Sequence, residues 1–284
     1  MASQAIGAAG AVKSLWRYPV KSMTGECLDE AVVTDGGLVG DRAYAVIDQS
    51  NGKVASAKVP KKWGGLLDLN AVFVEPPLAG TQIPAVRITR PGDADIVSTD
   101  READFQLSQT IGRPVRLTTQ RPASISVERL DPLSLDETIV DIGHLMLEGR
   151  FADYAAIHLL TTATLERLAE LSPGVSFDER RFRPNLVVDT EGDQSGFVEN
   201  HWVGRNLAIG DEVLLRLSDP TPRCSVPTLG QKGVSKDARV LRAIADHNLI
   251  PVALLDGENL PCAGVYGFVI RGGVIRKGDG VRLQ

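Results

Sequence analysis

Residues 207–228 have the sequence LAIGDEVLLRLSDPTPRCSVPT and combine the two features on which the expected fold depends, an apolar strand and a proline-rich segment. The run over residues 207–217 is rich in leucine, isoleucine and valine and predicts a strand. Pro220, Pro222 and Pro227 then each fix a φ angle and remove a backbone donor. The segment that follows the strand therefore cannot be a helix interior or a central strand, and we expect a stiff loop.

The expected loop carries one thiol, Cys224, next to the guanidinium of Arg223. An adjacent positive charge favours the thiolate, which is the form that attacks electrophiles and binds metals. The alternative is that Cys224 is packed as a small apolar residue, as free cysteines often are.

Outward from this stretch, the chain is a series of short apolar runs separated by Gly, Pro and Asp. This spacing indicates a mainly β fold with peripheral helices (α+β), with a barrel or a sandwich in the front part and a closed or partly closed barrel in the second half. The remaining expected strands are residues 11–18, 28–33, 43–47, 71–75, 85–89, 115–118, 186–188, 251–255, 265–270 and 281–283. Residues 121–149 are polar and broken by proline, so we expect a connection there that divides a domain over residues 8–120 from one over residues 121–284.

Three helices are expected outside the strands. One covers residues 101–110 with Thr99 or Asp100 as its cap, and Gly112 and Pro114 end it. A second begins at Thr161 or Thr162 and stops before Pro173, and a third covers residues 236–247 with Ser235 as its N-cap.

Composition excludes several classes of protein. The 284 residues carry a net charge of −5, which argues against general nucleic-acid binding, and no apolar run approaches the length of a membrane span. The N-terminus lacks the basic start of a signal peptide. Three cysteines without C-x-x-C spacing exclude a four-cysteine zinc or iron–sulfur site and fit a reducing compartment, so we expect a cytoplasmic protein.

Two groups of cations indicate anion binding. Lys21 with Ser22, and Arg42 some twenty residues later, lie at the ends of expected strands and can form an anion pocket. The alternative is ordinary solvated surface charge.

The second group is residues 181–185, RFRPN, in which Arg181 and Arg183 alternate and are expected on one strand face. An anion could lie between them, or Asp178 and Glu179 could neutralise them in an ion-pair network. Nearby, Thr161 and Thr162 begin a helix whose N-terminus is itself suited to an anion. His158 precedes them and is left outside the expected site as a structural residue.

These stretches, taken in order, resemble the MOSC family, which is named for the C-terminal domain of molybdenum-cofactor sulfurase, and specifically its two-domain members. The residues that carry the resemblance are SLWRYPVKS at 14–22, GDRAYAVID at 40–48, HLLTTATL at 158–165, RFRPN at 181–185, Arg223-Cys224 and GVYG at 264–267. The resemblance implies an N-terminal MOSC-type β-barrel domain over residues 8–120 and a MOSC domain over residues 121–284.

Within that family the chain resembles in architecture the mitochondrial amidoxime-reducing component and its bacterial counterparts. The resemblance implies that Cys224 is the thiolate ligand of a molybdenum ion held by molybdopterin. It further implies that the cofactor contacts Lys21, Ser22, Arg42, Thr161, Thr162, Arg181, Arg183 and Asn185, with Arg223 beside the metal. A cationic, hydrogen-bonding set suits an anionic phosphate on a polar ring, and a thiolate suits a soft metal site.

The implied activity is the two-electron reduction of N-hydroxylated small molecules, N-oxides or S-oxides. We expect neither a C-terminal ferredoxin segment nor an N-terminal membrane anchor, and therefore a separate electron-donor reductase or ferredoxin and no membrane span. Two alternatives remain open. Cys224 could carry a persulfide in a sulfur carrier or sulfurtransferase, or the chain could be a molybdenum-cofactor carrier protein.

Overall fold

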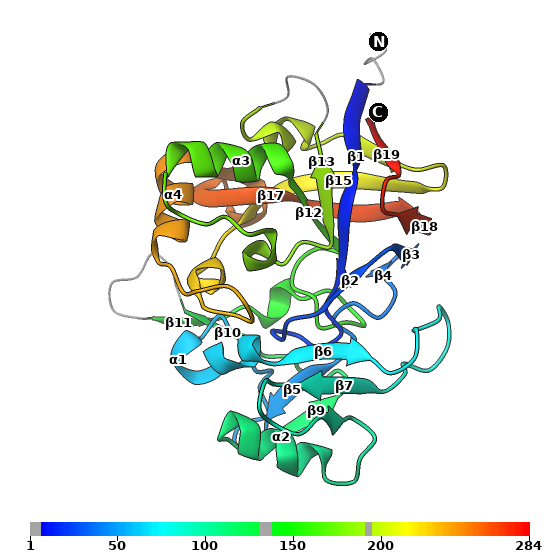
Figure 1. The fold of residues 1–284 in the computed structure, drawn as a ribbon, viewed down its shortest axis with the longest axis vertical. Helices are drawn as coiled ribbons and strands as arrows, with labels where there is room; N and C mark the ends of the chain where they lie inside the picture. The colour runs from blue at the N-terminus through cyan, green and yellow to red at the C-terminus, as the bar shows by residue number, and fades with distance from the viewer. Residues whose placement is uncertain (1–6, 131–137, 191–194) are drawn as a thin grey trace.

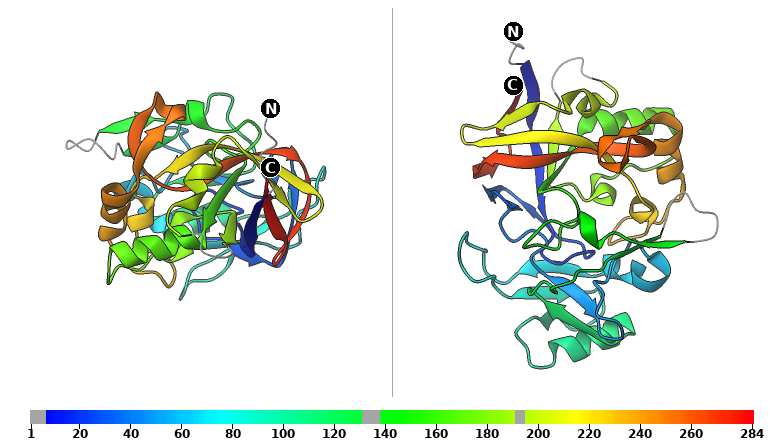
Figure 2. Two further views of the ribbon diagram at one scale, coloured as in Figure 1. Left: turned by 90° about the horizontal axis from the view of Figure 1, so that it is seen from above. Right: turned by 180° about the vertical axis from the view of Figure 1, so that it is seen from behind.

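A computed structural model of the chain describes residues 7–130, 138–190 and 195–284. The described residues include a closed barrel of seven strands in the order β12-β13-β1-β19-β14-β15-β17, with β17 pairing back to β12 (Figures 1 and 2). The prediction of a mainly β chain with a barrel and peripheral helices is confirmed.

The barrel strands are β12 (Ile157–Thr161), β13 (Leu186–Asp189), β1 (Gly7–Arg17), β19 (Gly280–Leu283), β14 (Asn206–Ile209), β15 (Val213–Pro222) and β17 (Glu258–Arg271). Two shorter strands extend the sheet, with β2 (Glu26–Leu28) paired to β1 and β16 (Leu249–Val252) paired to β17. The inward side chains of the barrel strands form one core, in which Leu15, Leu159, Leu215 and Val265 are fully buried.

The first strand and the last strand of the chain lie side by side in this barrel. Gly7 of β1 pairs with Leu283 of β19, and on its other side Leu15 of β1 pairs with Leu186 of β13 (Figure 1). The barrel therefore takes a strand from the front of the chain, whereas the strands between residues 30 and 141 form separate small sheets. The division near residue 120 stays a prediction.

The front half of the chain packs below the barrel in the view of Figure 1. Its sheets pair β18 (Gly273–Arg276) with β3 (Glu30–Thr34) and β4 (Gly37–Leu38), β5 (Ala45–Asp48) with β9 (Val115–Thr118), and β6 (Asn70–Phe73) with β7 (Val86–Thr89) and β8 (Ile96–Val97). A second core, with Trp63 and Leu107 buried in it, joins the last two of these sheets to α1 (Pro60–Trp63), η1 (Gly64–Asp68) and α2 (Ala103–Ile111).

The helices confirm the predicted positions but not all of the predicted caps. Helix α3 (Thr162–Leu171) begins as expected, because the Thr161 side chain accepts a hydrogen bond from the amide of Thr164. Helix α2 ends at Gly112 in the left-handed conformation, but its N-cap is Glu102 without a side-chain hydrogen bond. Helix α4 (Arg239–His247) begins later than predicted and is not capped by Ser235. The predicted cap residues of α2 and α4 were therefore wrong.

Two corrections concern the stretch over residues 207–228. The predicted single strand over residues 207–217 is a hairpin of β14 and β15, because Gly210 turns the chain with a φ of 56°. The predicted loop at Pro220 and Pro222 is instead the end of β15, opposite Val265 and Cys262 of β17. The ladder shifts register on either side of Pro220, which is how a strand accommodates residues that cannot donate a hydrogen bond.

The expected connection over residues 121–149 contains a small sheet of β10 (Glu128–Leu130) and β11 (Ile139–Asp141), followed by η2 (Gly143–Leu145). Residues 131–137 of that segment lie outside the described residues. Further 3₁₀ turns are η3 (Glu179–Phe182), η4 (Val198–Trp202), η5 (Val226–Thr228) and η6 (Ala253–Leu255), and the last of these replaces the second half of the strand expected over residues 251–255.

Candidate functional site

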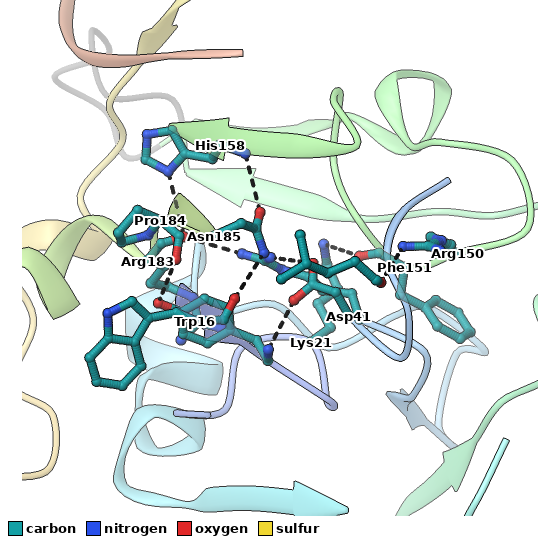
Figure 3. A network of polar contacts seen from close by, with 12 residues as sticks. Trp16, Lys21, Asp41, Arg150, Phe151, His158, Arg183, Pro184 and Asn185 are labelled. Atoms are coloured by element: carbon teal, nitrogen blue, oxygen red, sulfur yellow. Dashed lines mark hydrogen bonds and ion pairs between the residues drawn. The ribbon is translucent and has the colours of Figure 1, made fainter. Parts of the chain in front are cut away.

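A cavity of about 360 Å³ lies where the barrel meets the front half of the chain. Its volume is within the range of small-molecule binding sites. The predicted site residues that line it are Lys21, Ser22, Arg42, Arg183, Asn185, Arg223 and Cys224. Residues distant in the sequence therefore meet at one surface, as the close-up of its polar network shows for Lys21, Arg183 and Asn185 (Figure 3).

The lining is strongly cationic, although the chain as a whole has a net charge of −5. Its cations are Lys21, Arg42, Lys58, Arg129, Arg183 and Arg223, and its carboxylates are Asp153 and Glu258. Six positive charges against two negative charges in one concave surface favour an anionic ligand. The rest of the wall includes apolar side chains, those of Ile142, Leu145, Val226, Leu254, Leu255 and Leu260.

Two lysines share one carboxylate at the edge of the cavity. The ammonium of Lys21 lies 2.6 Å from Asp153 Oδ1 and donates to the Phe151 carbonyl at 3.0 Å, while Lys58 Nζ lies 2.7 Å from Asp153 Oδ2. Burial lowers the pKa of Lys21 to about 8, despite the opposing effect of Asp153. For Asp153, burial opposes ionisation, but the two lysines hold its pKa far below the usual range, so it is a carboxylate at neutral pH.

The backbone around the cavity is held in unusual conformations. Within the described part of the chain, the residues other than glycine that have positive φ are Ser22, Arg42, Arg183 and Asp256. The first three line the cavity, and Asp256 lies between the lining residues Leu255 and Glu258. A side chain in the left-handed region costs about 1–3 kcal/mol, and such costs concentrate at functional sites.

Asn185 and His158 tie β12 to β1 behind the cavity. The amide of His158 donates to Asn185 Oδ1 at 3.1 Å, and Asn185 Nδ2 donates to the Trp16 carbonyl at 3.3 Å (Figure 3). The His158 ring lies 3.4 Å from Arg223 Nη1 and 3.5 Å from the Arg183 carbonyl. Burial and the charge of Arg223 hold the pKa of His158 well below its usual value, so the ring is neutral.

Cys224 lies two residues after the end of β15 and is half-buried in the cavity wall. Its neighbour Arg223 is fixed by a hydrogen bond from its amide to the Pro261 carbonyl at 2.8 Å and from Nη2 to the Phe182 carbonyl at 2.8 Å. A partly accessible thiol beside a fixed guanidinium is the environment in which a thiolate can bind a metal. Cys262, opposite Pro222 on β17, is fully buried, and burial raises its pKa to about 12.

Unpaired polar atoms at the cavity identify what a ligand must supply. Of the seven buried side-chain nitrogen or oxygen atoms that have no hydrogen-bond partner in the described residues, four belong to the lining. They are Arg129 Nε, Arg183 Nη1, Thr221 Oγ1 and Arg223 Nε. Buried donors without acceptors are costly, so this set fits a ligand rich in acceptor oxygens, such as the phosphate and polar ring of a pterin cofactor.

The structure does not bring Arg181, Thr161 and Thr162 to the cavity. Arg181 is 2% exposed, and its guanidinium donates to the carbonyls of Ser176, Pro227 and Ser235 at 2.9, 3.2 and 2.8 Å.

The two threonines have partners within the barrel. The hydroxyl of Thr161 donates to the buried carboxyl of Glu199 at 2.7 Å, and that of Thr162 donates to Asp189 at 3.0 Å. Burial raises the pKa of Glu199, which also accepts from Thr164 and from the Gly264 amide. These contacts fix the start of α3 against β17.

The expected alternation of Arg181 and Arg183 on one strand face was wrong. Residues 179–182 form the 3₁₀ turn η3, and Arg183 ends it with a φ of 54°, so the two side chains diverge. The alternative ion-pair network is also absent from the described contacts of these two arginines. Asp178 pairs with Arg180, while Glu179 accepts from Ser14 and Trp16, each at 2.7 Å.

Sequence reasoning missed several residues of the lining. His158 was left out of the site but lies in the wall beside Arg223, and Asp153 and Lys58 were not assigned. A signal for Asp153 was available, since it precedes the buried strand β12 by a few residues. Lys58 had none, because a lysine close to Lys61 and Lys62 has the pattern of ordinary surface charge.

The described residues hold no cluster of three or more His, Cys, Asp or Glu side chains that could bind a metal ion by themselves. Any metal at Cys224 would therefore take its other ligands from elsewhere. Among the same residues, no helix has the length and hydropathy that crossing a bilayer requires.

Residues 147–282 match the MOSC domain family, and residues 9–62 match the MOSC N-terminal beta barrel domain. The chain is 26% identical to mitochondrial amidoxime reducing component 2 of Rattus norvegicus, over 96% of this chain and 82% of the rat protein. It is 27% identical to mitochondrial amidoxime-reducing component 1 of Homo sapiens, over 96% of this chain and 83% of the human protein.

A third relative is the molybdenum cofactor sulfurase of Oryza sativa subsp. japonica, which is 24% identical over 89% of this chain. The chain spans only 34% of the length of that rice protein.

Proposed function

Because the chain belongs to the MOSC-domain family, we propose that it is a molybdenum-cofactor-dependent reductase of N-hydroxylated small molecules. The names of the rat and human relatives support the reaction class. The observation that carries the proposal is a cationic cavity that contains Cys224 and four buried polar atoms without partners. Such a surface is incomplete until it holds an acceptor-rich, anionic group.

We assign the cofactor to this cavity by charge and position. The Cys224 thiolate would bind molybdenum, and Arg223, fixed by its own hydrogen bonds, would lie beside it. The phosphate would be held by Lys21, Ser22, Arg42 and Arg183. Three of these lining residues are cations, and Ser22, Arg42 and Arg183 have a left-handed backbone. Asn185 would support the polar ring from behind.

When bound, the molybdenum centre would supply the two-electron chemistry that removes oxygen from the N–O bond, and the net reaction takes up two protons and releases water. The chain's share is to bind, orient and shield. The apolar side chains of the lining, among them Leu145, Leu254 and Leu260, would exclude water and offer contact to the carbon skeleton of a substrate.

The electrons require a partner. We propose a separate electron-donor reductase or ferredoxin, since the described residues hold no cysteine or histidine cluster for an internal relay. We also place the protein in a reducing compartment such as the cytoplasm, because Cys27, Cys224 and Cys262 are all unpaired.

The test is to purify the chain from a host that makes the cofactor, and to measure molybdenum and pterin per chain. Reduction of benzamidoxime by a chemically reduced viologen dye is then followed as product formation. We expect about one metal and one pterin per chain, with turnover, and loss of molybdenum and turnover in Cys224→Ala. Cys262→Ala is the matched control, because that thiol is buried outside the lining, and it should retain both.

Other outcomes would replace the proposal. Metal and pterin without turnover on any N-hydroxylated compound would favour a cofactor carrier. A cyanide-labile sulfur on Cys224 without molybdenum would favour a sulfur carrier, the reading that the name of the rice relative also permits. Retention of molybdenum in Cys224→Ala would show that this thiolate is not the ligand.

A further inference from the structure

One buried aromatic ring contacts both arginines of the anion-binding end. The guanidinium carbon of Arg42 lies 4.5 Å from the centroid of the Tyr18 ring, and that of Arg183 lies 4.3 Å from it. Tyr18 itself is 3% exposed, and its hydroxyl donates to the Pro184 carbonyl at 3.2 Å. The ring therefore links the end of β1 to the turn before β13, which are more than 160 residues apart.

Two guanidiniums at one ring repel each other, and the protein neutralises only one of them. Arg42 pairs with the Asp41 carboxylate, whereas no carboxylate pairs with Arg183 in the described part of the chain. The Arg183 guanidinium is also left with a buried, unbonded Nη1. The negative face of an aromatic ring attracts cations, more strongly when water is excluded, so the ring compensates part of this repulsion.

The backbone explains why the ring is needed. Arg42 and Arg183 have φ values of 48° and 54°, so neither side chain leaves a regular strand or helix whose neighbours would fix it. The remaining contacts of the Arg183 guanidinium are few, and Arg42 Nη2 donates to the Arg183 carbonyl at 3.3 Å. Without the ring, the Arg183 side chain would have little to oppose rotation away from Arg42.

We propose that Tyr18 is a positioning residue that holds the Arg42 and Arg183 guanidiniums together at the cavity, ready to bind a phosphate group between them. The inference rests on the proposed function for the identity of the natural ligand, a cofactor phosphate, but not for the anion site itself. Tyr18 acts through the negative face of its ring, and its hydroxyl serves only to dock on Pro184.

The experiment changes the electrostatics of the ring and leaves its shape nearly constant. Tyr18 is replaced by phenylalanine and then, by amber suppression, by mono-, di- and trifluorophenylalanine, which progressively weaken the negative potential of the ring face. The full chain is purified without cofactor, and its affinity for inorganic phosphate is measured by titration calorimetry. We expect Tyr18→Phe to bind almost as the parent does, and the affinity to fall stepwise to about tenfold weaker with trifluorophenylalanine and in Tyr18→Leu.

Tyr44 provides the matched control. It is 8% exposed, and its hydroxyl likewise donates to a proline carbonyl, that of Pro84 at 3.0 Å, but its ring packs in the core of the front half. Tyr44→Leu should lower the stability while phosphate affinity stays unchanged.

The possible outcomes test three separate claims: the role of the ring face, the anion site and the proposed cofactor. Equal affinity across the fluorinated series, or a loss in Tyr18→Phe as large as in Tyr18→Leu, would overturn the role of the ring face. Absence of phosphate binding by the parent chain would overturn the anion site and this inference with it. A stepwise fall in phosphate affinity, in a chain that acquires no molybdenum from a competent host, would support the inference and contradict the proposed cofactor.

Discussion

Replacing Arg181 and Arg183 separately by alanine should have different effects. The change at Arg181 should lower stability, whereas the change at Arg183 should weaken cofactor binding. Both residues belong to the stretch RFRPN, and both were expected to contact the same ligand. The structure gives Arg181 three carbonyl partners and no place in the cavity, and it gives Arg183 a place in the cavity and an unbonded Nη1. We therefore expect opposite effects on the free energy of unfolding.

The Arg181 side chain connects three segments. Its hydrogen bonds to Ser176, Pro227 and Ser235 join the loop after α3 to both ends of the segment that follows Cys224. Truncation leaves three carbonyls without their donor and opens a cavity in a site that is 2% exposed. The free energy of unfolding should fall by about 3–5 kcal/mol. This is the usual cost of removing one partner from a buried, charged hydrogen-bond network while the other partners remain.

The Arg183 side chain destabilises the folded chain when no ligand is bound. Burial lowers its pKa to about 10, well below the usual value of a guanidinium, which corresponds to about 3 kcal/mol against the charged form at about 1.4 kcal/mol for each pKa unit. Alanine removes this cost but also the contact with the Tyr18 ring, which contributes about 1–2 kcal/mol. The left-handed backbone remains strained, because alanine also carries a Cβ. Arg183→Ala should therefore raise the free energy of unfolding of the unliganded chain by about 1–2 kcal/mol.

Urea unfolding at pH 7.5 gives both free energies, and molybdenum and pterin content give the binding. Arg181→Ala should unfold at lower urea and, at low temperature where it is folded, keep its cofactor. Arg183→Ala should unfold at equal or higher urea and lose its cofactor. The reasoning is refuted if Arg183→Ala is destabilised as much as Arg181→Ala, or if Arg181→Ala loses the cofactor without losing stability.

The remaining predictions concern the neighbourhood of the cavity. Asp153→Asn should lower the free energy of unfolding by about 2–3 kcal/mol. This is less than the cost at a fully buried ion pair, because the Asp153 side chain is 35% exposed. Urea titration measures the change, with Lys58→Met as the comparison variant. Below pH 8, Lys21 is protonated in both the folded and the unfolded chain. Between pH 8 and about 10.5, Lys21 is protonated only in the unfolded chain. Stability should therefore rise over that window by up to about 3 kcal/mol, and a rise that persists in Lys21→Met would contradict the assignment. Gly264→Ala places a Cβ 2.4 Å from His158 Nε2 at a φ of +90°, so it should cost about 3 kcal/mol or more, and a thermal midpoint equal to that of the parent would disprove the clash.

The sequence by itself determined the properties that depend on neighbouring residues. Short apolar runs between Gly and Pro predicted a mainly β chain, and the start of α3 was predicted at Thr161 or Thr162, of which Thr161 is the cap. Strand periodicity and helix capping involve residues within a few positions. The family resemblance indicated Lys21, Arg42, Arg183 and Cys224 as members of one site, and all four line the same cavity.

The tertiary structure alone decided the features that depend on distant residues. It placed β1 between β13 and β19, because closing the barrel requires a strand there and no local pattern specifies which one. It also separated Arg181 from Arg183, since a left-handed residue at the end of η3 reverses the direction expected from strand alternation. Lys58 and Asp153 met only through folding. Long-range burial, which a sequence pattern does not encode, fixes where such charges come together.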